Sequence, residues 1–377
     1  MEPKSVKHKQ EIANQIKERK DEHIQICLEE DVKARNITTG FEDIHLIHRA
    51  LPEISLKEID LSTTVFNHLF SAPLIVEGMT GGTEKAITIN AAIAQAVEEL
   101  GLGMGVGSQR AAIEDPTLEK TFKVAREEAP NAFLIANLGG PQLIKGYGVK
   151  EAQRAVEMIE ADALAIHLNP LQEVVQPEGE TDYKGIIEEI SEIVKGLDVP
   201  VIVKETGAGI AAEEAKTLEA IGVSGIDVAG AGGTSWAAVE YYRAKKQGNQ
   251  SAQMFGEALW DWGIPTAISL VEVIQSVSLP VIASGGIRSG EDAAKAIALG
   301  ASLTGIAWPA LVSALKGSAA VKETLNLMIG QLTSAMFLVG ADSIKKLKVS
   351  PLVLTGKTAE WLRTRGFTLE IYARKKK

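Results

Sequence analysis

Cysteine is almost absent from this sequence: Cys27 is the single example in 377 residues. One cysteine excludes an internal disulfide framework and any zinc or iron–sulfur site built from four cysteines. Long apolar runs are absent too, because no stretch reaches the roughly 18 uninterrupted apolar residues of a membrane-spanning helix. The N-terminal segment is charged and lacks the apolar core of a secretion signal, so we expect a cytoplasmic protein without a membrane partner.

Positive charge is in deficit as well, with 39 lysines and arginines against 49 aspartates and glutamates. This balance argues against a nucleic-acid-binding surface and means that locally placed cations must hold any anionic substrate. What the chain does have is apolar material, 45% of its residues, which is enough for one large core. Its length fits either about two or three domains or one barrel with extensions.

From Ala72 onwards, short apolar runs alternate with amphipathic helical segments at intervals of roughly 30 residues, a pattern typical of βα units around a parallel sheet. The predicted strands are residues 73–76, 101–107, 133–136, 163–166, 201–203, 225–228, 281–283 and 302–307. Eight such units in succession predict an α/β protein with a closed (β/α)8 TIM barrel. The alternative, a doubly wound sheet, would have to explain why polar residues finish every strand.

Three segments extend the predicted barrel of residues 72–367. Residues 1–71 are predicted to form an N-terminal helical arm, with apolar residues such as Ile12 and Ile16 at helical spacing, and a capping segment. The capping segment is predicted to contain a short hairpin, 54–60 with 64–69. A long aromatic-rich insertion, 230–265, follows the sixth strand and is of the kind used as a lid or subunit contact. Residues 368–377 form a basic tail, most simply a solvated terminus.

Polar residues stand at the ends of seven different predicted strands. They are Thr80, Ser108, Asn137, His167, Lys204, Thr234 and Arg288. Barrel enzymes keep their chemistry at the carboxyl ends of the strands. Each residue alone could be read as a helix N-cap, but a lysine and a histidine do not fit that role well. Together they predict a ligand site.

The segment 280–310 contains the clearest local motif, a buried strand followed by Ser284-Gly285-Gly286-Ile287-Arg288 and a helix. Paired glycines let the backbone turn sharply and bring its N–H groups against a ligand, and the helix start adds further donors. Loops after strands 7 and 8 of such barrels form the usual phosphate site. The alternative is a tight turn with a surface arginine.

Gly101, Gly103, Gly105 and Gly107 recur with period two and so share one face of the second strand. They do not match the dinucleotide-binding pattern G-x-G-x-x-G, and no separate dinucleotide-binding unit is visible. A face without side chains either leaves room for a flat ring or is a barrel layer of small residues. Both interpretations stay open.

The segment from His167 to Glu173 places an imidazole, two amides and a carboxylate around one strand-to-helix turn. A single carboxylate with neutral donors suits Mg²⁺, which keeps several waters and takes substrate phosphate oxygens. Alternatively, Glu173 simply stabilises the first turn of a helix.

Lys204 is either a Schiff-base nucleophile or a cation beside an electron-rich cofactor ring, and the second option fits better with a nearby phosphate site.

Six motifs together resemble the type 2 isopentenyl diphosphate isomerases, which are FMN-dependent barrel enzymes. In chain order they are Arg19-Lys20-Asp21-Glu22-His23, Gly78-Met79-Thr80-Gly81-Gly82, Ser108-Gln109-Arg110, His167-Leu168-Asn169-Pro170-Leu171-Gln172-Glu173, Gly232-Gly233-Thr234-Ser235-Trp236 and Ser284-Gly285-Gly286-Ile287-Arg288. The resemblance extends from about residue 19 to residue 367, with no departure at these motifs.

The resemblance implies that isopentenyl diphosphate and dimethylallyl diphosphate are interconverted, as in isoprenoid biosynthesis. It implies reduced FMN as the acid and base, NADPH or NADH as the reductant, and Mg²⁺ on the substrate diphosphate. It also implies a homo-oligomer, a tetramer or octamer. The basic arm would then fold over bound substrate and exclude water.

The resemblance also assigns residues. The FMN contacts would be Gly78, Met79, Thr80, Ser108, Asn137, Lys204, Thr234, Gly285, Gly286, Ile287, Arg288, Ala307 and Trp308. The substrate contacts would be Arg19, Lys20, His23, Ser108, Gln109, Arg110, Asn169 and Gln172. Gln172, His167 and Lys204 would be catalytic, Glu173 would hold Mg²⁺, and Glu240 would lie close to the site.

Three rival functions are weaker. An FMN-dependent 2-hydroxy acid oxidase needs a histidine base just after strand 6, where this chain has Ala229-Gly230-Ala231-Gly232. A nucleotide dehydrogenase of the same barrel group needs a catalytic loop cysteine, and Cys27 lies in the arm instead. A non-catalytic flavin-binding protein would not require the cluster from His167 to Glu173.

Overall fold

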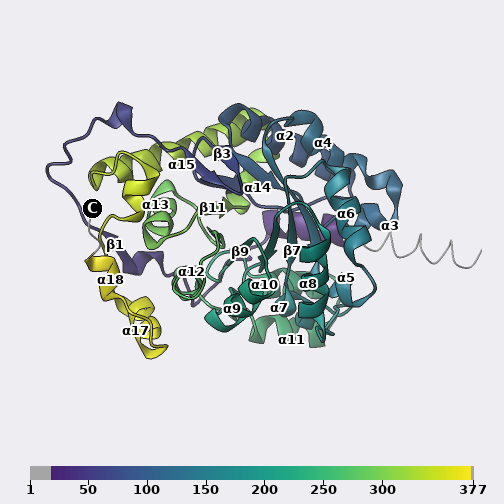
Figure 1. Cartoon of the computed structure of the whole chain (residues 1–377). Coiled ribbons are helices and arrows are strands. Elements are labelled where there is room, and N and C mark those ends of the chain that lie inside the picture. Colours follow the sequence, from purple (N-terminus) through teal and green to yellow (C-terminus); the bar gives the residue numbers. More distant parts are fainter. Residues whose placement is uncertain (1–17, 375–377) are drawn as a thin grey trace, which may run out of the picture.

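The computed structural model describes residues 18–374. Within this range, eight parallel strands close a barrel in the order β10-β11-β4-β5-β6-β7-β8-β9 (Figure 1). The strands are β4 Leu74–Val76, β5 Gly103–Gly105, β6 Phe133–Gly139, β7 Ala163–His167, β8 Val201–Lys204, β9 Gly225–Asp227, β10 Val281–Ala283 and β11 Leu303–Ile306. The closed order confirms the TIM barrel and rules out the doubly wound alternative.

Helices alternate with these strands and cover the outside of the barrel. They are α2 Glu84–Leu100, α3 Arg110–Glu114, α4 Lys120–Glu128, α5 Gly140–Ile144, α6 Val149–Met158, α7 Pro170–Val175, α8 Ile186–Gly196, α9 Ala212–Ala220, α10 Trp236–Lys246, α11 Gln250–Ala258, α12 Thr266–Ile274, α13 Gly290–Leu299, α14 Trp308–Ala314, α15 Ser318–Leu338, α16 Ile344–Lys348, α17 Gly356–Thr364 and α18 Glu370–Ala373. Short 3₁₀ turns are η1 Phe41–Asp43, η2 Leu56–Glu58 and η3 Pro116–Leu118. None of the helices described in residues 18–374 is long and apolar enough to cross a membrane.

The glycines of the second strand have a packing explanation. Gly101 has a φ of 61° and ends α2, so it lies outside the strand. A Cβ added at Gly105 would lie 3.1 Å from the backbone nitrogen of Gly78, and one at Gly107 would lie 2.6 Å from the backbone of Thr80. Real Cβ contacts of 2.6 Å do not occur, so the missing side chains allow the neighbouring strand end to approach closely. The small-residue layer is therefore the correct interpretation.

The barrel is closed at its amino end by a hairpin that differs from the predicted one. Residues 54–60 contain the turn η2, and the hairpin pairs β2 Thr63–Val65 with β3 His68–Phe70. Its turn residues Phe66 and Asn67 have φ of 52° and 61°, the left-handed conformation of a two-residue hairpin turn. Phe66 stacks on Phe133 of β6 at 5.9 Å between ring centroids. Sequence patterns missed this turn because phenylalanine rarely adopts positive φ.

The C-terminal segment is also packed rather than wholly solvated. Strand β12 Leu352–Leu354 pairs with β1 Ile44–Leu46, which ties the segment before the barrel to the segment after it. Tyr372 of α18 is 2% exposed and belongs to the main apolar core. The prediction of a solvated tail is therefore wrong for Leu369 and Tyr372, whereas Glu370, Ile371 and Ala373 are exposed, and residues 375–377 lie outside the described range.

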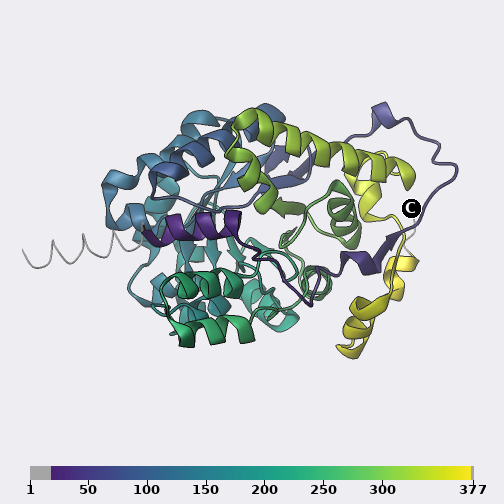
Figure 2. The same cartoon turned by 180° about the vertical axis from the view of Figure 1, so that it is seen from behind.

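A helix over residues 18–29, here called the arm helix, lies across the carboxyl face of the barrel, opposite the hairpin (Figure 2). Helices α10 and α11 of the insertion lie beside it. Ile26 and Val32 are buried against Val239 and Trp260 of the insertion. The helical arm and the insertion after strand 6 are thus confirmed, and they pack on each other. The helical spacing at Ile12 and Ile16 lies outside the described residues.

Candidate active site

Two adjacent hollows open at the carboxyl ends of the barrel strands. We call them the glycine hollow and the polar hollow. The glycine hollow is lined by the loops after β10, β11 and β4 and by one side of the arm helix, including Gly285, Gly286, Arg288 and Trp308. The polar hollow is lined by the ends of β5, β6 and β7, by α7 and by the other side of the arm helix. Both share a wall that contains Lys20, Thr80 and Lys204.

The glycine hollow has the features of a phosphate cradle. Gly285 and Gly286 have φ of 97° and 72°, and a Cβ at Gly285 would lie 2.2 Å from the carbonyl oxygen of Gly230. Only glycine fits both positions, so the backbone can approach a ligand closely. Ser289 caps the helix α13 that follows, as its hydroxyl accepts a hydrogen bond from the backbone N–H of Asp292. The guanidinium of Arg288 stacks on the ring of Trp308 at 5.0 Å.

The glycine hollow also fits a planar ring with polar edges, as FMN has. The hydroxyl of Thr80 is buried in the shared wall and has no hydrogen-bond partner among the described residues. A buried polar atom without a partner is costly unless a ligand completes it. Gly78 also lines this hollow, although its missing side chain is explained by packing, since a Cβ there would lie 2.1 Å from the carbonyl oxygen of Val106. These observations support the flavin that the resemblance implies.

All predicted cofactor residues line one of these two hollows. Those lining the glycine hollow are Gly78, Met79, Thr80, Lys204, Thr234, Gly285, Gly286, Ile287, Arg288, Ala307 and Trp308. Ser108 and Asn137 line the polar hollow instead.

Cys27 lines the glycine hollow from the arm helix, and burial together with Glu240 raises the pKa of its thiol to about 12. It is therefore a thiol at neutral pH and not a nucleophile.

Lys204 lies in a buried layer of charged groups beneath both hollows. Its Nζ lies 3.1 Å from an Asp227 carboxylate oxygen and 3.6 Å from one of Glu77. Burial lowers the pKa of Lys204, but these carboxylates outweigh it and raise the pKa. An amine held protonated by two carboxylates is a poor nucleophile, so these contacts favour the cation interpretation over the Schiff-base interpretation. Burial and the neighbouring Asp227 raise the pKa of Glu77 to about 8.

Asp227 is a site residue that the sequence analysis missed. It lies at the end of β9, accepts a 2.6 Å hydrogen bond from the hydroxyl of Ser284 and is 1% exposed. A carboxylate inside an apolar strand, Ile226-Asp227-Val228, is costly to bury unless it has a partner. A charged residue within an otherwise apolar strand was therefore the sequence signal that could have identified Asp227.

The polar hollow gathers basic side chains. Nζ of Lys20, on the arm helix, donates a 2.8 Å hydrogen bond to the carbonyl oxygen of Ser108. Burial lowers the pKa of Lys20 to about 7, and the charges of Arg19 and Arg110 act in the same direction. Arg110, at the start of α3, has a buried Nε without a hydrogen-bond partner among the described residues. Crowded cations with an unused donor suit a multiply charged anion.

His167 ends β7 and is held by a neighbouring strand. Its Nδ1 lies 2.8 Å from the amide oxygen of Asn137. Burial, together with the charges of Lys204 and Lys20, lowers the pKa of His167 to about 3. The ring is therefore neutral near pH 7 in this structure. A neutral ring favours a role for His167 in orienting a substrate oxygen over one as a cationic acid, and its catalytic role stays a prediction.

Gln109 is the predicted substrate contact that the structure places elsewhere. Its side chain is fully buried, with the amide oxygen accepting from the backbone N–H of Asn137 at 2.8 Å. The amide nitrogen donates to the carbonyl oxygen of Ala155 at 2.8 Å. Both ends of the amide are thus used to join β6 to α6, away from both hollows. The substrate-contact prediction for Gln109 is wrong.

Glu173 lies on α7, in the wall of the polar hollow. Its carboxylate accepts 2.8 Å and 2.7 Å hydrogen bonds from the side chain of Asn169 and the backbone N–H of Glu180. Within residues 18–374, no three histidine, cysteine or acidic side chains form a metal-binding group. Mg²⁺ bound by one carboxylate, substrate phosphate oxygens and water fits this donor set, whereas zinc does not.

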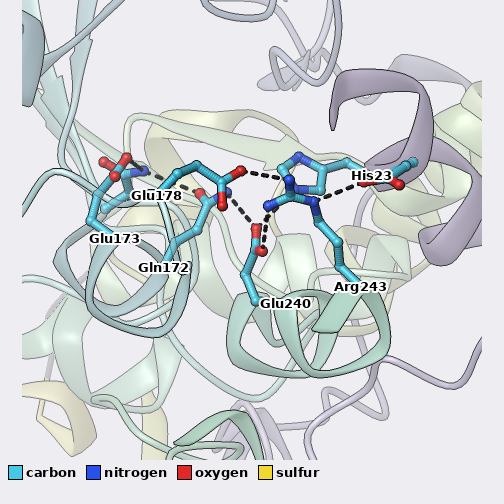
Figure 3. A network of polar contacts seen from close by, with 8 residues as sticks. His23, Gln172, Glu173, Glu178, Glu240 and Arg243 are labelled. Carbon is cyan, nitrogen blue, oxygen red and sulfur yellow. Dashed lines mark hydrogen bonds and ion pairs between the residues drawn. The ribbon is translucent and has the colours of Figure 1, made fainter. Parts of the chain in front are cut away.

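Glu240 of α10 is the centre of a network that joins three segments (Figure 3). His23 of the arm helix donates a 2.8 Å hydrogen bond from Nε2 to Glu240, and the amide of Gln172 donates to the same oxygen at 3.4 Å. Arg243 contacts the other oxygen at 3.3 Å. Burial raises the pKa of Glu240, but His23 and Arg243 outweigh burial and lower it. Glu240 is therefore an ionised carboxylate although it is 1% exposed.

Most predicted substrate contacts therefore meet in one hollow. Those lining it are Arg19, Lys20, His23, Ser108, Arg110, Asn169 and Gln172. They come from the arm helix, the β5–α3 loop and α7, which lie far apart in the sequence. Gln176 joins them: with its amide oriented to suit both neighbours, it accepts from Arg19 at 3.0 Å and donates to Glu240 at 3.3 Å.

Comparison with known proteins identifies the relatives of this chain. The sequence profile of the FMN-dependent dehydrogenase family matches residues 178–354. The chain is 53% identical over 360 residues to the isopentenyl-diphosphate delta-isomerase of Methanothermobacter thermautotrophicus, covering 96% of this chain and 99% of that protein. It is 52% identical over 356 residues to the isopentenyl-diphosphate delta-isomerase of Pyrococcus furiosus, covering 92% and 89%.

Among solved structures, a mandelate oxidase variant with an FMN adduct has a TM-score of 0.60 and 19% identity, over 88% of this chain and 95% of that one. Identity this low supports the barrel fold alone. The similarity to the isomerases, in contrast, combines a much higher identity with coverage of nearly the full chain. The motifs on which the resemblance was based line the two hollows. This chain belongs to the type 2, FMN-dependent isopentenyl-diphosphate delta-isomerase family.

Proposed function

We propose that the protein interconverts isopentenyl diphosphate and dimethylallyl diphosphate, with FMN in the glycine hollow and the substrate diphosphate in the polar hollow. The shared wall of the two hollows supports this most strongly, because Lys20, Thr80 and Lys204 face both. A ring bound in one hollow and an anion bound in the other are therefore neighbours. The proposal includes the predicted homo-oligomer, a tetramer or octamer, which sedimentation would measure.

FMN, when bound and reduced by NADPH or NADH, supplies an electron-rich ring whose nitrogens can act as acid and base. The protein's share is electrostatic and positional. The protonated Lys204 favours negative charge in the glycine hollow. Gly285 and Gly286 leave backbone N–H groups for a phosphate, and Arg288 adds a guanidinium.

In the polar hollow, we assign the substrate diphosphate to Arg19, Lys20 and Arg110. Hydrogen bonds from charged donors contribute roughly 1.5–3 kcal/mol each, so this end of the substrate anchors the rest. Asn169 and Glu240 hold Gln172 on either side, which makes Gln172 the group that orients the hydrocarbon end. The arm helix covers the hollow and excludes water from the reacting double bond.

Raising the pH above about 7 should weaken substrate binding, because free Lys20, with a pKa of about 7, loses the proton that the diphosphate requires. Bound diphosphate favours the charged form, so the KM for substrate should rise by up to about tenfold per pH unit above that value. Lys20→Arg stays charged and should flatten the profile. KM measured against pH for both proteins checks this, and a flat wild-type profile would contradict it.

Replacing Glu173 by Gln should raise the Mg²⁺ concentration needed for half-maximal activity by at least about ten- to a hundredfold, the scale seen when even indirect partners of a metal are lost. Activity titrated with Mg²⁺ measures the change, and FMN affinity should be unaltered. Glu192→Gln, on the exposed face of α8, is the matched control. An unchanged Mg²⁺ requirement in the Glu173 variant would remove Glu173 from the metal site.

A substrate comparison tests the proposed function itself. The FMN-loaded protein is reduced anaerobically and offered isopentenyl diphosphate, and separately oxidised and offered 2-hydroxy acids. We expect isomer formation in the first case and no reaction in the second. Oxidation of a hydroxy acid without isomerisation would replace the proposal by the oxidase alternative.

A further inference from the structure

Arg243 of α10 contacts carboxylates from three separate segments (Figure 3). Its Nε lies 2.8 Å from Glu22 of the arm helix, and its Nη2 lies 2.5 Å from Glu178 in the loop after α7. Its Nη1 lies 3.3 Å from Glu240 on its own helix. Each contact uses a different nitrogen of the planar guanidinium, an arrangement that an ammonium cannot reproduce.

The segments that Arg243 joins each carry part of the polar hollow. The arm helix brings Arg19, Lys20 and His23; α7 brings Gln172 and Glu173; α10 brings Trp236, and its Glu240 holds His23 and Gln172 from behind. Arg243 itself lines neither hollow. We propose that Arg243 is a positioning residue that holds the arm helix and the α7–α8 loop against α10 and thereby assembles the substrate side of the site.

Burial separates this group from an ordinary surface ion pair. Arg243 is 8% exposed and Glu240 is 1% exposed, whereas Glu22 and Glu178 are partly accessible. Ion pairs on the surface contribute little to the stability of a protein. Removing one member of a buried pair is costly, because it leaves an uncompensated charge. Loss of the guanidinium therefore affects Glu240 and also releases the two outer segments.

The other contacts of the arm helix determine which part of it should loosen when Arg243 is lost. After residue 25 the chain is held by apolar packing of Ile26 and Val32 and by backbone hydrogen bonds, such as that from the N–H of Ser235 to the carbonyl oxygen of Val32. Before residue 24 the arm helix relies on polar contacts of Lys20, Glu22 and His23, and Ile24 is the first of its residues to be buried in the apolar core. Without Arg243, the segment around Lys20 should open while Ile26 stays packed.

Trypsin cleavage of the FMN-loaded, substrate-free protein tests this opening, because trypsin cuts after accessible lysine and arginine. Arg243→Gln should be cut after Arg19 or Lys20 at least about ten times faster than the wild type. Glu22→Gln and Glu178→Gln remove one outer contact each and should give intermediate rates. Arg154→Gln, which removes an exposed pair with Glu119, is the matched control. Equal rates in wild type and Arg243→Gln would overturn the proposal.

Kinetics provide a second readout, which rests on the proposed function whereas the cleavage test does not. Opening of the arm should raise the KM for isopentenyl diphosphate in Arg243→Gln by at least about tenfold with unchanged FMN affinity. Arg243→Lys keeps the positive charge but lacks the three nitrogens of the planar guanidinium, so this variant should still be cleaved faster than the wild type. If Arg243→Gln does not fold, the two glutamate variants carry the test, and wild-type cleavage rates and KM in both would overturn it.

The acid limb of the kcat profile should also move. The titratable and charged groups that interact with Glu240 are Arg19, His23 and Cys27 from the arm helix and Arg243 from its own helix, while Glu173 of α7 and Glu178 of the following loop act on Arg19. Arg243 is among the groups that lower the pKa of Glu240, so its loss should shift the acid limb to higher pH. Arg243→Lys should restore that limb. A limb unmoved in Arg243→Gln would contradict the role assigned to Arg243.

Discussion

Replacing Lys204 by Met is expected to lower the free energy of unfolding by about 3–5 kcal/mol and to abolish tight FMN binding. The substitution keeps the length of the side chain but leaves Asp227 and Glu77 buried without their shared cation. These carboxyls must then either ionise unpaired or hold protons. The ammonium that would face the flavin in the proposed complex is lost at the same time.

The pH dependence of this destabilisation has a definite sign. Lys204 is protonated in the folded and unfolded wild type near neutral pH, so it contributes no slope there. In the variant, Lys204 no longer lowers the pKa of Glu77, which burial and Asp227 already raise, so Glu77 of the folded state holds its proton to higher pH than in the wild type. Its stability therefore falls more steeply with pH, and the loss should be larger at about pH 8 than at about pH 6.

Urea unfolding of the FMN-free proteins and FMN titration measure the two effects. Adding Glu77→Gln to Lys204→Met should recover part of the stability, because one buried carboxyl is removed, but not the flavin affinity. Lys195→Met removes an exposed pair with Glu192 and should change stability by less than about 0.5 kcal/mol. A fully stable, flavin-binding Lys204→Met would show that the buried charge layer has no such role.

Replacing Arg110 by Ala is expected to lower kcat/KM by about 10²–10⁴, the equivalent of losing roughly 3–5 kcal/mol from two charge-assisted hydrogen bonds. The buried Nε of Arg110 has no partner within the described chain and lies in the polar hollow beside Lys20. In the proposed complex the diphosphate takes that donor. Because the anchored diphosphate positions the alkene, kcat should fall as well as KM rise.

Calorimetric titration with inorganic diphosphate separates binding from chemistry. Its affinity should fall by at least about a hundredfold in Arg110→Ala, while FMN affinity stays unchanged. Arg154→Ala, which removes a partly exposed pair between α6 and Glu119 outside both hollows, is the control. A loss of less than about threefold in diphosphate affinity would place the anion elsewhere.

The sequence predicted the barrel and most strand-end residues because one physical rule covers them. Buried parallel strands give short apolar runs, and a polar residue such as His167 or Lys204 directly after such a run must lie at the carboxyl edge. Loop glycines that require positive φ, Gly285 and Gly286, were likewise visible in the sequence.

The contacts between distant segments could not be predicted in this way. Arg243 and Glu22 look like solvated helix charges, and only the fold brings these residues, 221 positions apart, into contact. Gln109 lies inside a predicted substrate motif, yet its side chain turns toward α6 because the backbone of Asn137 takes its oxygen. Side-chain direction of this kind depends on packing, which local patterns do not encode.

Anaerobic turnover in D₂O tests the proposed isomerisation most directly. The protein is mixed with FMN, NADPH, Mg²⁺ and isopentenyl diphosphate, and the product is followed by NMR. We predict dimethylallyl diphosphate that carries deuterium, formed with reduced flavin and absent when the flavin is left oxidised. FMN binding without any deuterated isomer would contradict the proposed function.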